Sequence, residues 1–368
     1  TQLFFTPVAG WNNYDNTMVG LAFYNSLLPF KKMEFAVMPM YSFGSKNLTG
    51  SAKVGYTWYP KGNALQNVRL SVGGARYSNG EYASTSQILF PQYTSRTPVQ
   101  YNKIKPELSF EFKKPFARST VTNRLTLTHY QVIFSNYNKE FIRFESNGNV
   151  FVKILPQDDY YINVLSWNHK NARTLNPYSI DIGVEQADYF VKVSLEGKYR
   201  ISYKWQNKGL DIRLFAGRFI FNDFPNVNPR YGFAMDGNSD YRFDEVFLGR
   251  RETSGILSRQ FALNDGGFKN EVSIPSSQTW LSALNLQTPV LSNWPIAVYA
   301  DIGWSSGNPD EVVLGAGGAL VLIKGVFEVY FPFYASGGML YPQYEKNIRF
   351  VLNLAHLNPF ELLKKMPN

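Results

Sequence analysis

Polar and apolar residues alternate with a period of two along most of this chain. The clearest stretch, KVSLEGKYRISYKW at 192–205, places apolar residues from Val193 to Trp205 on one face and polar residues from Lys192 to Lys204 on the other. An average strand has only about 5–6 residues. The same alternation recurs in LTGSAKVGYTW, NVRLSV, KIKPELSFEF, SIDIGVE and LDIRLFA. The pattern predicts an all-β fold built from long, amphipathic strands.

Turn signals divide the chain into about 16 strands, within a range of about 12–16. We place them at 2–9, 17–27, 33–42, 48–58, 67–79, 102–112, 117–134, 158–169, 177–186, 190–205, 210–221, 277–288, 295–304, 311–322, 325–334 and 346–357.

The connections between these strands differ in length according to their order. Short links follow the even strands, and long ones follow odd strands at 80–101, 135–157, 222–276 and 335–345. Transmembrane barrels have short periplasmic turns and long extracellular loops, and an even strand number returns both termini to one side. The sequence therefore predicts a transmembrane antiparallel up-and-down β-barrel.

We expect a single outer-membrane barrel domain over 1–368, integral to a bacterial outer membrane. Within it, 222–276 would be a long extracellular loop or plug, and 358–368 a periplasmic tail. Lipid supplies no partners for backbone N–H and C=O groups, so a spanning sheet has to close on itself. The 222–276 segment is far longer than the roughly 12–15 residues at which structureless loops become uncommon. We expect it to fold over or into the barrel and to pair its acids with bases such as Lys198 and Arg213.

The two faces of the strands predict two environments, lipid for the apolar face and a watery lumen for the charged face. Aromatic residues near the strand ends suit a membrane-interface girdle. The girdle candidates are Trp58, Tyr199, Tyr203 and Trp205. The lumen-facing candidates are Lys53, Arg69, Lys103, Lys105, Glu107, Glu111, Lys192, Glu196, Lys198, Arg200, Lys204 and Arg213.

Composition narrows the class of protein further. Charged residues make up 18% of the chain, below the roughly 25% of typical soluble domains. The longest apolar run, at 312–323, is too short for a transmembrane helix. The chain has no cysteine, and its net charge of +9 comes from Lys and Arg residues that never form a run longer than two. These features exclude disulfides and thiolate zinc sites, and they argue against nucleic acid as a partner.

No motif for catalysis, a cofactor or a metal stands out. His129, His169 and His356 lie far apart, and the chain has neither an H-E-x-x-H helix nor a G-x-S-x-G elbow. DGNSD at 236–240 resembles the start of a calcium loop, but the glycine and glutamate that such a loop needs are absent. A looser calcium site there stays an alternative. We expect no enzymatic activity from this chain.

Several longer phrases carry a resemblance to a known family. They are MVGLAFYNSLLPFKKMEFAVMPMYSFGSKNLTG, LNPYSIDIGVEQADYFVKVSLEGKYRISYKW, LDIRLFAG, NDGGFKNEVS and NPFELLKKM. The chain resembles the C-terminal outer-membrane β-barrel domain associated with aminopeptidase-N-like (gluzincin) zinc metallopeptidases of Bacteroidota. The family's zinc ligands and catalytic glutamate lie in a peptidase domain without counterpart here, so the resemblance assigns no site residue.

The leading functional hypothesis is a membrane anchor or scaffold for a peptidase domain or partner protein. Its partners would be outer-membrane lipid and lipopolysaccharide, with a periplasmic or surface protein or an upstream peptidase domain. The main alternative is a porin-like channel with a basic lumen that favours anions. An insertase would need a V-R-G-F/Y-like loop motif, which is missing, and a soluble carbohydrate-binding β protein does not explain the grouping of the long loops.

Overall fold

The computed structural model describes most of the chain. It covers residues 2–353 except 27–30, 63, 87–92, 136–137, 145–149, 157–158, 205–207, 225–229, 238–239, 273–275, 292–293, 337–339 and 341. The predicted girdle residue Trp205, His356 and the predicted tail at 358–368 lie outside the described residues.

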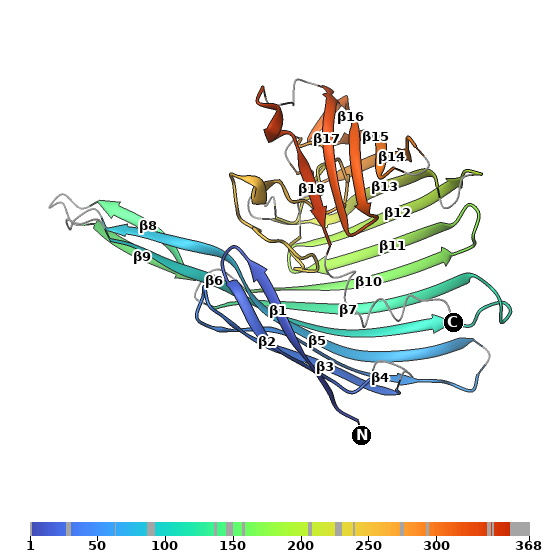
Figure 1. The fold of residues 1–368 in the computed structure, drawn as a ribbon, viewed down its shortest axis with the longest axis horizontal. Helices are drawn as coiled ribbons and strands as arrows, with labels where there is room; N and C mark the ends of the chain where they lie inside the picture. The colour runs from blue at the N-terminus through green and yellow to red at the C-terminus, as the bar shows by residue number, and fades with distance from the viewer. Residues whose placement is uncertain are drawn as a thin grey trace.

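One sheet of sixteen strands makes up most of the fold, and each strand pairs antiparallel with its neighbour along the chain (Figure 1). Its first seven strands are β1 (Phe4–Asn12), β2 (Asn16–Tyr24), β3 (Met33–Ser42), β4 (Leu48–Trp58), β5 (Leu65–Ser86), β6 (Tyr93–Phe112) and β7 (Val121–Ser135). The other nine are β10 (Tyr160–Asn171), β11 (Tyr178–Ala187), β12 (Phe190–Ser202), β13 (Gly209–Asn222), β14 (Trp280–Pro289), β15 (Ile296–Ser305), β16 (Asn308–Ile323), β17 (Phe327–Ala335) and β18 (Arg349–Leu352).

The predicted all-β, antiparallel up-and-down architecture with sixteen strands is confirmed. Two of the predicted loops are wrong in detail. Most of 80–101 is strand, because β5 and β6 continue their ladder to the pair Ser86 and Tyr93. The predicted loop at 135–157 contains a separate hairpin, β8 (Asn138–Phe144) paired with β9 (Val150–Pro156).

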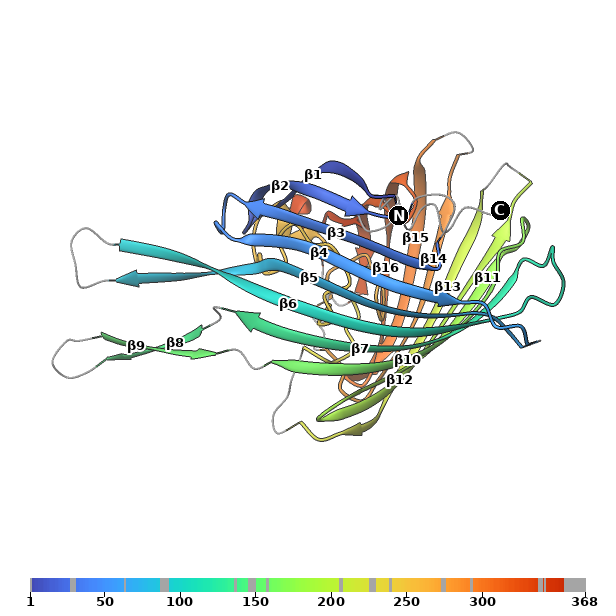
Figure 2. The same cartoon turned by 90° about the horizontal axis from the view of Figure 1, so that it is seen from below.

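The connections sort to opposite ends of the sheet. The turns that follow β2, β4, β6, β10, β12, β14 and β16 are at one end, which we call the short-turn end. It lies on the right in Figures 1 and 2, and the β8–β9 hairpin extends to the left from the other, long-loop end. The strand order thus places the three longest connections, β7 to β10, β13 to β14 and β17 to β18, on one side.

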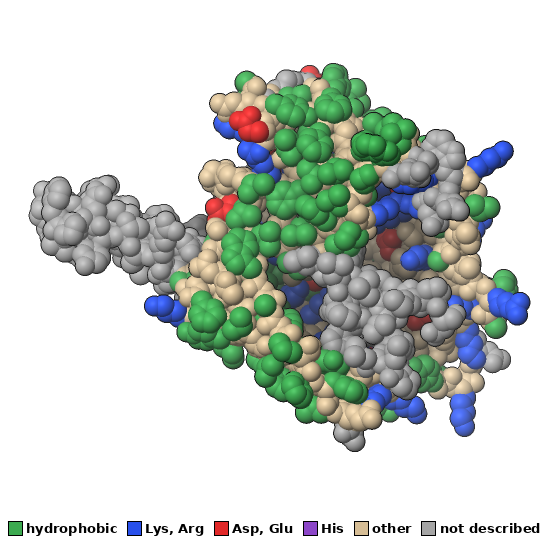
Figure 3. Space-filling model, in the orientation of Figure 1, with side chains coloured by type: hydrophobic (Ala, Val, Ile, Leu, Met, Phe, Trp, Pro, Cys, Tyr) green, Lys and Arg blue, Asp and Glu red, His purple; other side chains and the backbone are tan. Residues whose placement is uncertain are grey.

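The sheet is strongly curled (Figures 1 and 2). Its two faces differ in chemistry. The convex face carries large apolar residues, such as Leu127 and Leu165, which lie opposite each other and are 45% and 40% exposed. Figure 3 shows hydrophobic side chains spread over the outside of the β14–β18 part of the sheet. The concave face carries charged residues such as Lys198 and Arg213, which lie opposite each other on neighbouring strands. Alternation along each strand therefore separates apolar from charged side chains, as the sequence predicts.

β1 and β18 form the two edges of the sheet, and no ladder joins them within the described residues. In the same part of the chain, no helix is long and apolar enough to cross a membrane. The long connection between β13 and β14 lies inside the curl of the sheet (Figure 1).

A charge placed on the convex face should be far more costly than the loss of one from the concave face. Leu195, in the middle of β12, is 41% exposed on the convex face. Leu195→Arg should lower the free energy of unfolding in lipid vesicles by about 2–4 kcal/mol, because an arginine would enter hydrocarbon. Lys53→Leu, on the concave face of β4, is the matched control and should cost much less. Equal losses for the two variants would contradict this assignment of the faces.

Candidate functional site: the interior segment

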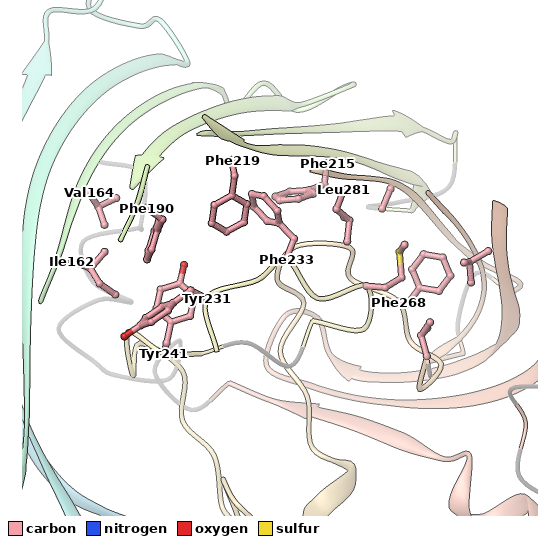
Figure 4. Packing of buried hydrophobic residues seen from close by; sticks show 14 of the residues in the cluster. Ile162, Val164, Phe190, Phe215, Phe219, Tyr231, Phe233, Tyr241, Phe268 and Leu281 are labelled. Atoms are coloured by element: carbon pink, nitrogen blue, oxygen red, sulfur yellow. The ribbon is translucent and has the colours of Figure 1, made fainter. Parts of the chain in front are cut away.

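Residues 223–279, between β13 and β14, form the candidate functional site, and we call them the interior segment. Its described residues have little regular structure beyond the short helix η1 (Ile256–Arg259). Its aromatic residues pack against the concave face of the sheet to form the largest hydrophobic cluster of the described residues (Figure 4). From the segment come Tyr231, Phe233, Met235, Tyr241, Phe268 and Val272, and from the sheet Tyr130, Ile162, Val164, Phe190, Phe215, Phe219, Leu281, Ala283 and Val313.

Phe233 is the centre of this contact. Its ring is 1% exposed and lies 5.2 Å from the ring of Phe219 and 5.9 Å from that of Phe215, both in β13. A Cβ atom at Gly217 of β13 would come within 2.5 Å of the Phe233 ring. Gly303 of β15 leaves room in the same way, because a Cβ atom there would lie 2.3 Å from Met235 Sδ. These two glycines allow the segment to lie directly against the strands of the sheet, which we call the wall.

A buried lysine of the wall is covered by the segment. Lys192 of β12 is 3% exposed, and its ammonium lies 4.7 Å from the centre of the Phe233 ring and 4.8 Å from that of Tyr241. It donates a hydrogen bond to the carbonyl oxygen of Tyr231 at 3.2 Å and lies 3.8 Å from Glu185 of β11. A buried ammonium needs such partners, so the wall and the segment depend on each other here.

Asp244 links the segment to β6 and β7. One carboxylate oxygen lies 3.1 Å from Lys103 Nζ and 3.3 Å from Lys105 Nζ, and the other accepts a hydrogen bond of 2.7 Å from the Tyr130 hydroxyl. Burial alone would raise the pKa of Asp244, but Lys103, Lys105 and Arg242 hold it well below its usual range. The carboxylate therefore stays charged, and the ion pairs persist to low pH.

A second pair of charges stabilises the segment internally. Asp240 accepts a 2.6 Å hydrogen bond from Arg250 and two more from the backbone N–H groups of Asp244 and Glu245. The Arg250 guanidinium lies 4.6 Å from the Phe243 ring centre and 4.9 Å from that of Phe247. The carboxylate that the DGNSD pattern offered to calcium is thus occupied by an arginine.

Polar contacts also fix the segment to the strands near the C-terminal edge. Lys269 Nζ lies 2.6 Å from Asp301 of β15, and Asn285 of β14 donates to Asp301 at 2.9 Å and to the Gly266 carbonyl at 3.0 Å. Arg349 of β18 donates to the carbonyl oxygens of Phe268 and Asn270, at 3.3 and 2.9 Å. The NDGGF turn presents its backbone to these side chains, and Gly267 adopts a left-handed φ of 61° there.

The segment reaches both edges of the sheet. The Asn13 backbone N–H, just after β1, donates to the Leu248 carbonyl at 2.7 Å, and the Asn13 side chain donates to Glu252 at 2.9 Å. At the other edge, the Phe261 backbone N–H donates to the Phe350 carbonyl of β18 at 3.0 Å, beside an isolated parallel bridge between Gln260 and Phe350. The first turn and the last strand are therefore tied to the same piece of chain.

The predicted lumen-facing residues divide into two groups in the structure. Lys103, Lys105 and Lys192 contact the interior segment, as described above. Most of the others form ion pairs within the sheet, and Lys105 does so as well. These pairs are Arg69 with Glu34, Lys105 with Glu107, Arg124 with Glu111, Lys198 and Arg213 with Glu196, and Arg200 with Asp211. Lys53 and Lys204 are exposed.

The predicted partners of the segment's acids are wrong. Lys198 and Arg213 both pair with Glu196, which lies on the same face of β12 and β13, whereas Asp244 pairs with Lys103 and Lys105. Lys198 has this acid two residues away on its own strand, and Arg213 has it on the neighbouring strand. Asp236 instead lies 4.0 Å from Arg349.

Of the predicted girdle residues, Trp58 and Tyr199 are exposed on the convex face, 43% and 39% respectively. Tyr203 follows the end of β12 and is half-buried, with its hydroxyl 2.8 Å from that of Thr288. Sequence reasoning missed Asp15, a fully buried carboxylate that accepts hydrogen bonds from Asn12, Ser45 and Ser78. Only its place in the turn N-N-Y-D-N-T marks it in the sequence.

The described residues contain no group of three His, Asp or Glu side chains that could hold a metal ion. His129 and His169 each contact an asparagine instead, at 2.7 and 2.6 Å. Among the described residues, two of the cavities border the interior segment. One, of about 350 Å³, lies toward the short-turn end, and the other, of about 630 Å³, lies toward the long-loop end and is lined by Phe134, Tyr160 and Phe247 among others.

Comparison with known proteins gives no family. No family model matches the chain, and no curated protein matches it. Among solved structures, the chain is similar to BamA from Haemophilus ducreyi lacking POTRA domains 1–3, with 12% identity and a TM-score of 0.46 over 95% of this chain and 69% of that one. It is also similar to CdiB from Acinetobacter baumannii, with 13% identity and a TM-score of 0.41 over 92% of this chain and 57% of that one.

The Asp244 contacts predict an acid-dependent loss of stability. Because the pKa of Asp244 is lowered by folding, its contribution is complete above the unfolded value of about 4 and is lost as the pH falls below it. Asp244→Asn should lower the free energy of unfolding at pH 7 by roughly 1.5–3 kcal/mol, the scale of hydrogen bonds to charged groups. The variant should also flatten the decline of the free energy of unfolding between pH 4 and pH 2, as measured by denaturant titration in detergent.

Glu34→Gln is the matched control, because Glu34 pairs with Arg69 within the wall. In this variant Asp244 is intact, so the part of the stability loss at low pH that Asp244 causes should remain. If Asp244→Asn and the wild type lost stability in parallel below pH 4, the proposed role of these ion pairs would be wrong.

Proposed function

We propose that this chain is an integral outer-membrane β-barrel that anchors or supports a protein partner and does not form an open pore. The observation that carries the proposal is the interior segment, which packs its aromatic residues and ion pairs against the concave face of the sheet. A sheet of this size encloses a wide aqueous channel unless something fills it.

The convex face supports a membrane setting. Strands from β2 to β16 expose large apolar side chains there, including Leu21, Leu70, Leu214 and Val298. Soluble monomers rarely expose continuous apolar patches larger than a few hundred Å². Membrane-spanning sheets have this division between an apolar outside and a polar inside, and outer-membrane lipid and lipopolysaccharide are the surroundings that fit it.

The position of the segment argues against the porin-like alternative. The two cavities lie on opposite sides of the segment, one toward each end of the strands. Concave bases that would have attracted anions through a pore are engaged by acids, as Lys103 and Lys105 are by Asp244 and Lys192 is by Glu185. An anchor needs no open path, so its interior can be filled to stabilise the barrel.

The resemblance to barrels associated with aminopeptidase-N-like metallopeptidases supports the kind of partner we propose. In this proposal, the chain holds a peptidase domain or a separate periplasmic or surface protein at the membrane, and the partner performs the chemistry. Mass spectrometry of the protein isolated from its native membrane tests this directly. Recovery of peptides from a larger covalent or tightly bound partner is expected, and isolation of the barrel alone would remove support for the anchor.

The purified barrel should be silent in planar lipid bilayers. Deleting 230–255 removes Phe233, Asp240 and Asp244 together, so the same recording should then show steady single-channel conductance, because water and ions can enter the hollow.

Deletion of 139–155 is the matched control, because it shortens a long connection of the same end whose strands pair only with each other. This control should remain silent. Large and steady conductance of the unmodified protein would overturn the anchor proposal and favour the porin.

A further inference from the structure

The cavity at the short-turn end has a composition that the anchor role does not require. It has a volume of about 350 Å³ and lies between the interior segment, at Leu263 and Lys269, and the ends of β10 to β14 and β17. Its volume falls at the lower end of the range of about 300–1,000 Å³ that is typical of small-molecule sites. We call it the basic cavity.

Among the charged residues of its lining, bases outnumber acids. Six of the lining residues are basic and two are acidic: Lys170, Lys198, Arg200, Arg213, Lys269 and Lys324 against Asp211 and Glu328. Glu196 and Asp301 pair with members of this set, and Asp181 lies opposite Glu196 in the neighbouring strand. Even with these three acids counted, the bases remain in excess.

The acids are shared rather than matched one to one. Asp211 lies 2.7 Å from Arg200 Nε and 2.5 Å from Lys324 Nζ, and Glu196 pairs with both Lys198 and Arg213. Lysine and arginine side chains carry only donors, three on each ammonium and five on each guanidinium. Arg213 also donates to the Asn285 side-chain oxygen at 2.8 Å. These acceptors are fewer than the N–H groups of the four bases, which leaves donors for a further acceptor.

The outer pairs can also exchange partners at little cost. The side chains of Lys198 and Lys324 are 54% and 53% exposed. Ion pairs with exposed members contribute little to stability. The inner pair of Lys269 with Asp301 differs, because its side chains are 3% and 0% exposed and form part of the floor. The cavity thus combines a fixed floor with cations at its rim that are free to move toward a ligand.

We propose that the basic cavity binds the phosphate group of a small organic phosphate ester. A phosphate presents three strong acceptor oxygens and nearly two negative charges at neutral pH, which matches converging donors from Arg200, Arg213, Lys198 and Lys324 better than a carboxylate with two oxygens. Arginine binds such groups through two parallel hydrogen bonds, and lysine binds them as a point charge. The space beyond the phosphate accommodates its organic part.

The same phosphate chemistry has two sources, a soluble ester in the compartment at the short-turn end and the headgroup of a lipid. Isothermal titration of the full chain in detergent tests both. Glycerol 3-phosphate is the soluble probe, micelles doped with phosphatidic acid are the lipid probe, and succinate tests whether a carboxylate serves equally well.

Both phosphate probes, or one of them, should bind the wild type, and the one that binds more tightly identifies the source. The double variant Lys198→Gln/Lys324→Gln should weaken that binding at least tenfold. Lys61→Gln, an exposed lysine in the short turn between β4 and β5 outside the cavity, is the matched control and should leave the affinity unchanged. A circular dichroism spectrum identical to the wild type's establishes that the double variant folds.

Three results would each overturn the proposal: no binding of either phosphate probe, succinate binding as tight as that of the better phosphate probe, or equal weakening by Lys61→Gln and the double variant. If the double variant failed to fold, Arg200→Lys, which keeps the charge but loses the paired hydrogen bonds, should weaken the better phosphate probe by a smaller factor. If Arg200→Lys then bound the better phosphate probe with unchanged affinity, the proposal would be overturned. None of these results depends on conductance, so the anchor proposal stands or falls separately.

Discussion

The structure depends on one constraint. A curled sheet whose convex face is apolar has charged side chains on its concave face, and these side chains need hydrogen-bond or ion-pair partners. Successive residues of a strand point to opposite faces, so every apolar residue on the outside is next to a polar or charged one on the inside. Sixteen strands carry this alternation. Charges taken out of bulk water are costly unless they are paired. Neighbouring strands supply most of those partners, and the interior segment supplies others, through Asp244 for β6 and through the carbonyl oxygen of Tyr231 for Lys192 of β12.

The segment explains features that lie far apart along the chain. Gly217 and Gly303 are needed because Phe233 and Met235 lie directly against them. Arg349, in the last strand, binds the backbone of the NDGGF turn, and Asn13, after the first strand, binds the backbone of Leu248. Strands at both edges of the sheet are thereby held to the same piece of chain. A segment packed against the concave face suits the structural role that we propose, and it leaves the basic cavity free to bind a ligand of its own.

Much of the fold was predictable, because strand alternation and turn residues are local signals. They give the sixteen strands, the antiparallel order and the two faces. The β8–β9 hairpin had a signal too, the letters S-N-G-N between two alternating stretches of the sequence, but the grouping of 135–157 as a loop hid it. The contacts of the interior segment could not be predicted from the sequence. The acids were recognisable, but whether Asp244 meets Lys103 or Lys198 depends on the path of an irregular chain, and Lys198 pairs with Glu196.

Hydrogen–deuterium exchange of the intact protein in detergent tests the central claim most directly. The backbone N–H groups of Phe233, Phe261 and Phe268 donate to Ser277, Phe350 and Met235, at 2.8, 3.0 and 3.0 Å. If the segment is packed inside the sheet, these amides should exchange roughly a thousandfold more slowly than in an unstructured chain, as an opening free energy of about 4 kcal/mol requires. Exchange across 231–268 at the rate of an unstructured chain, with the strands still protected, would contradict the account.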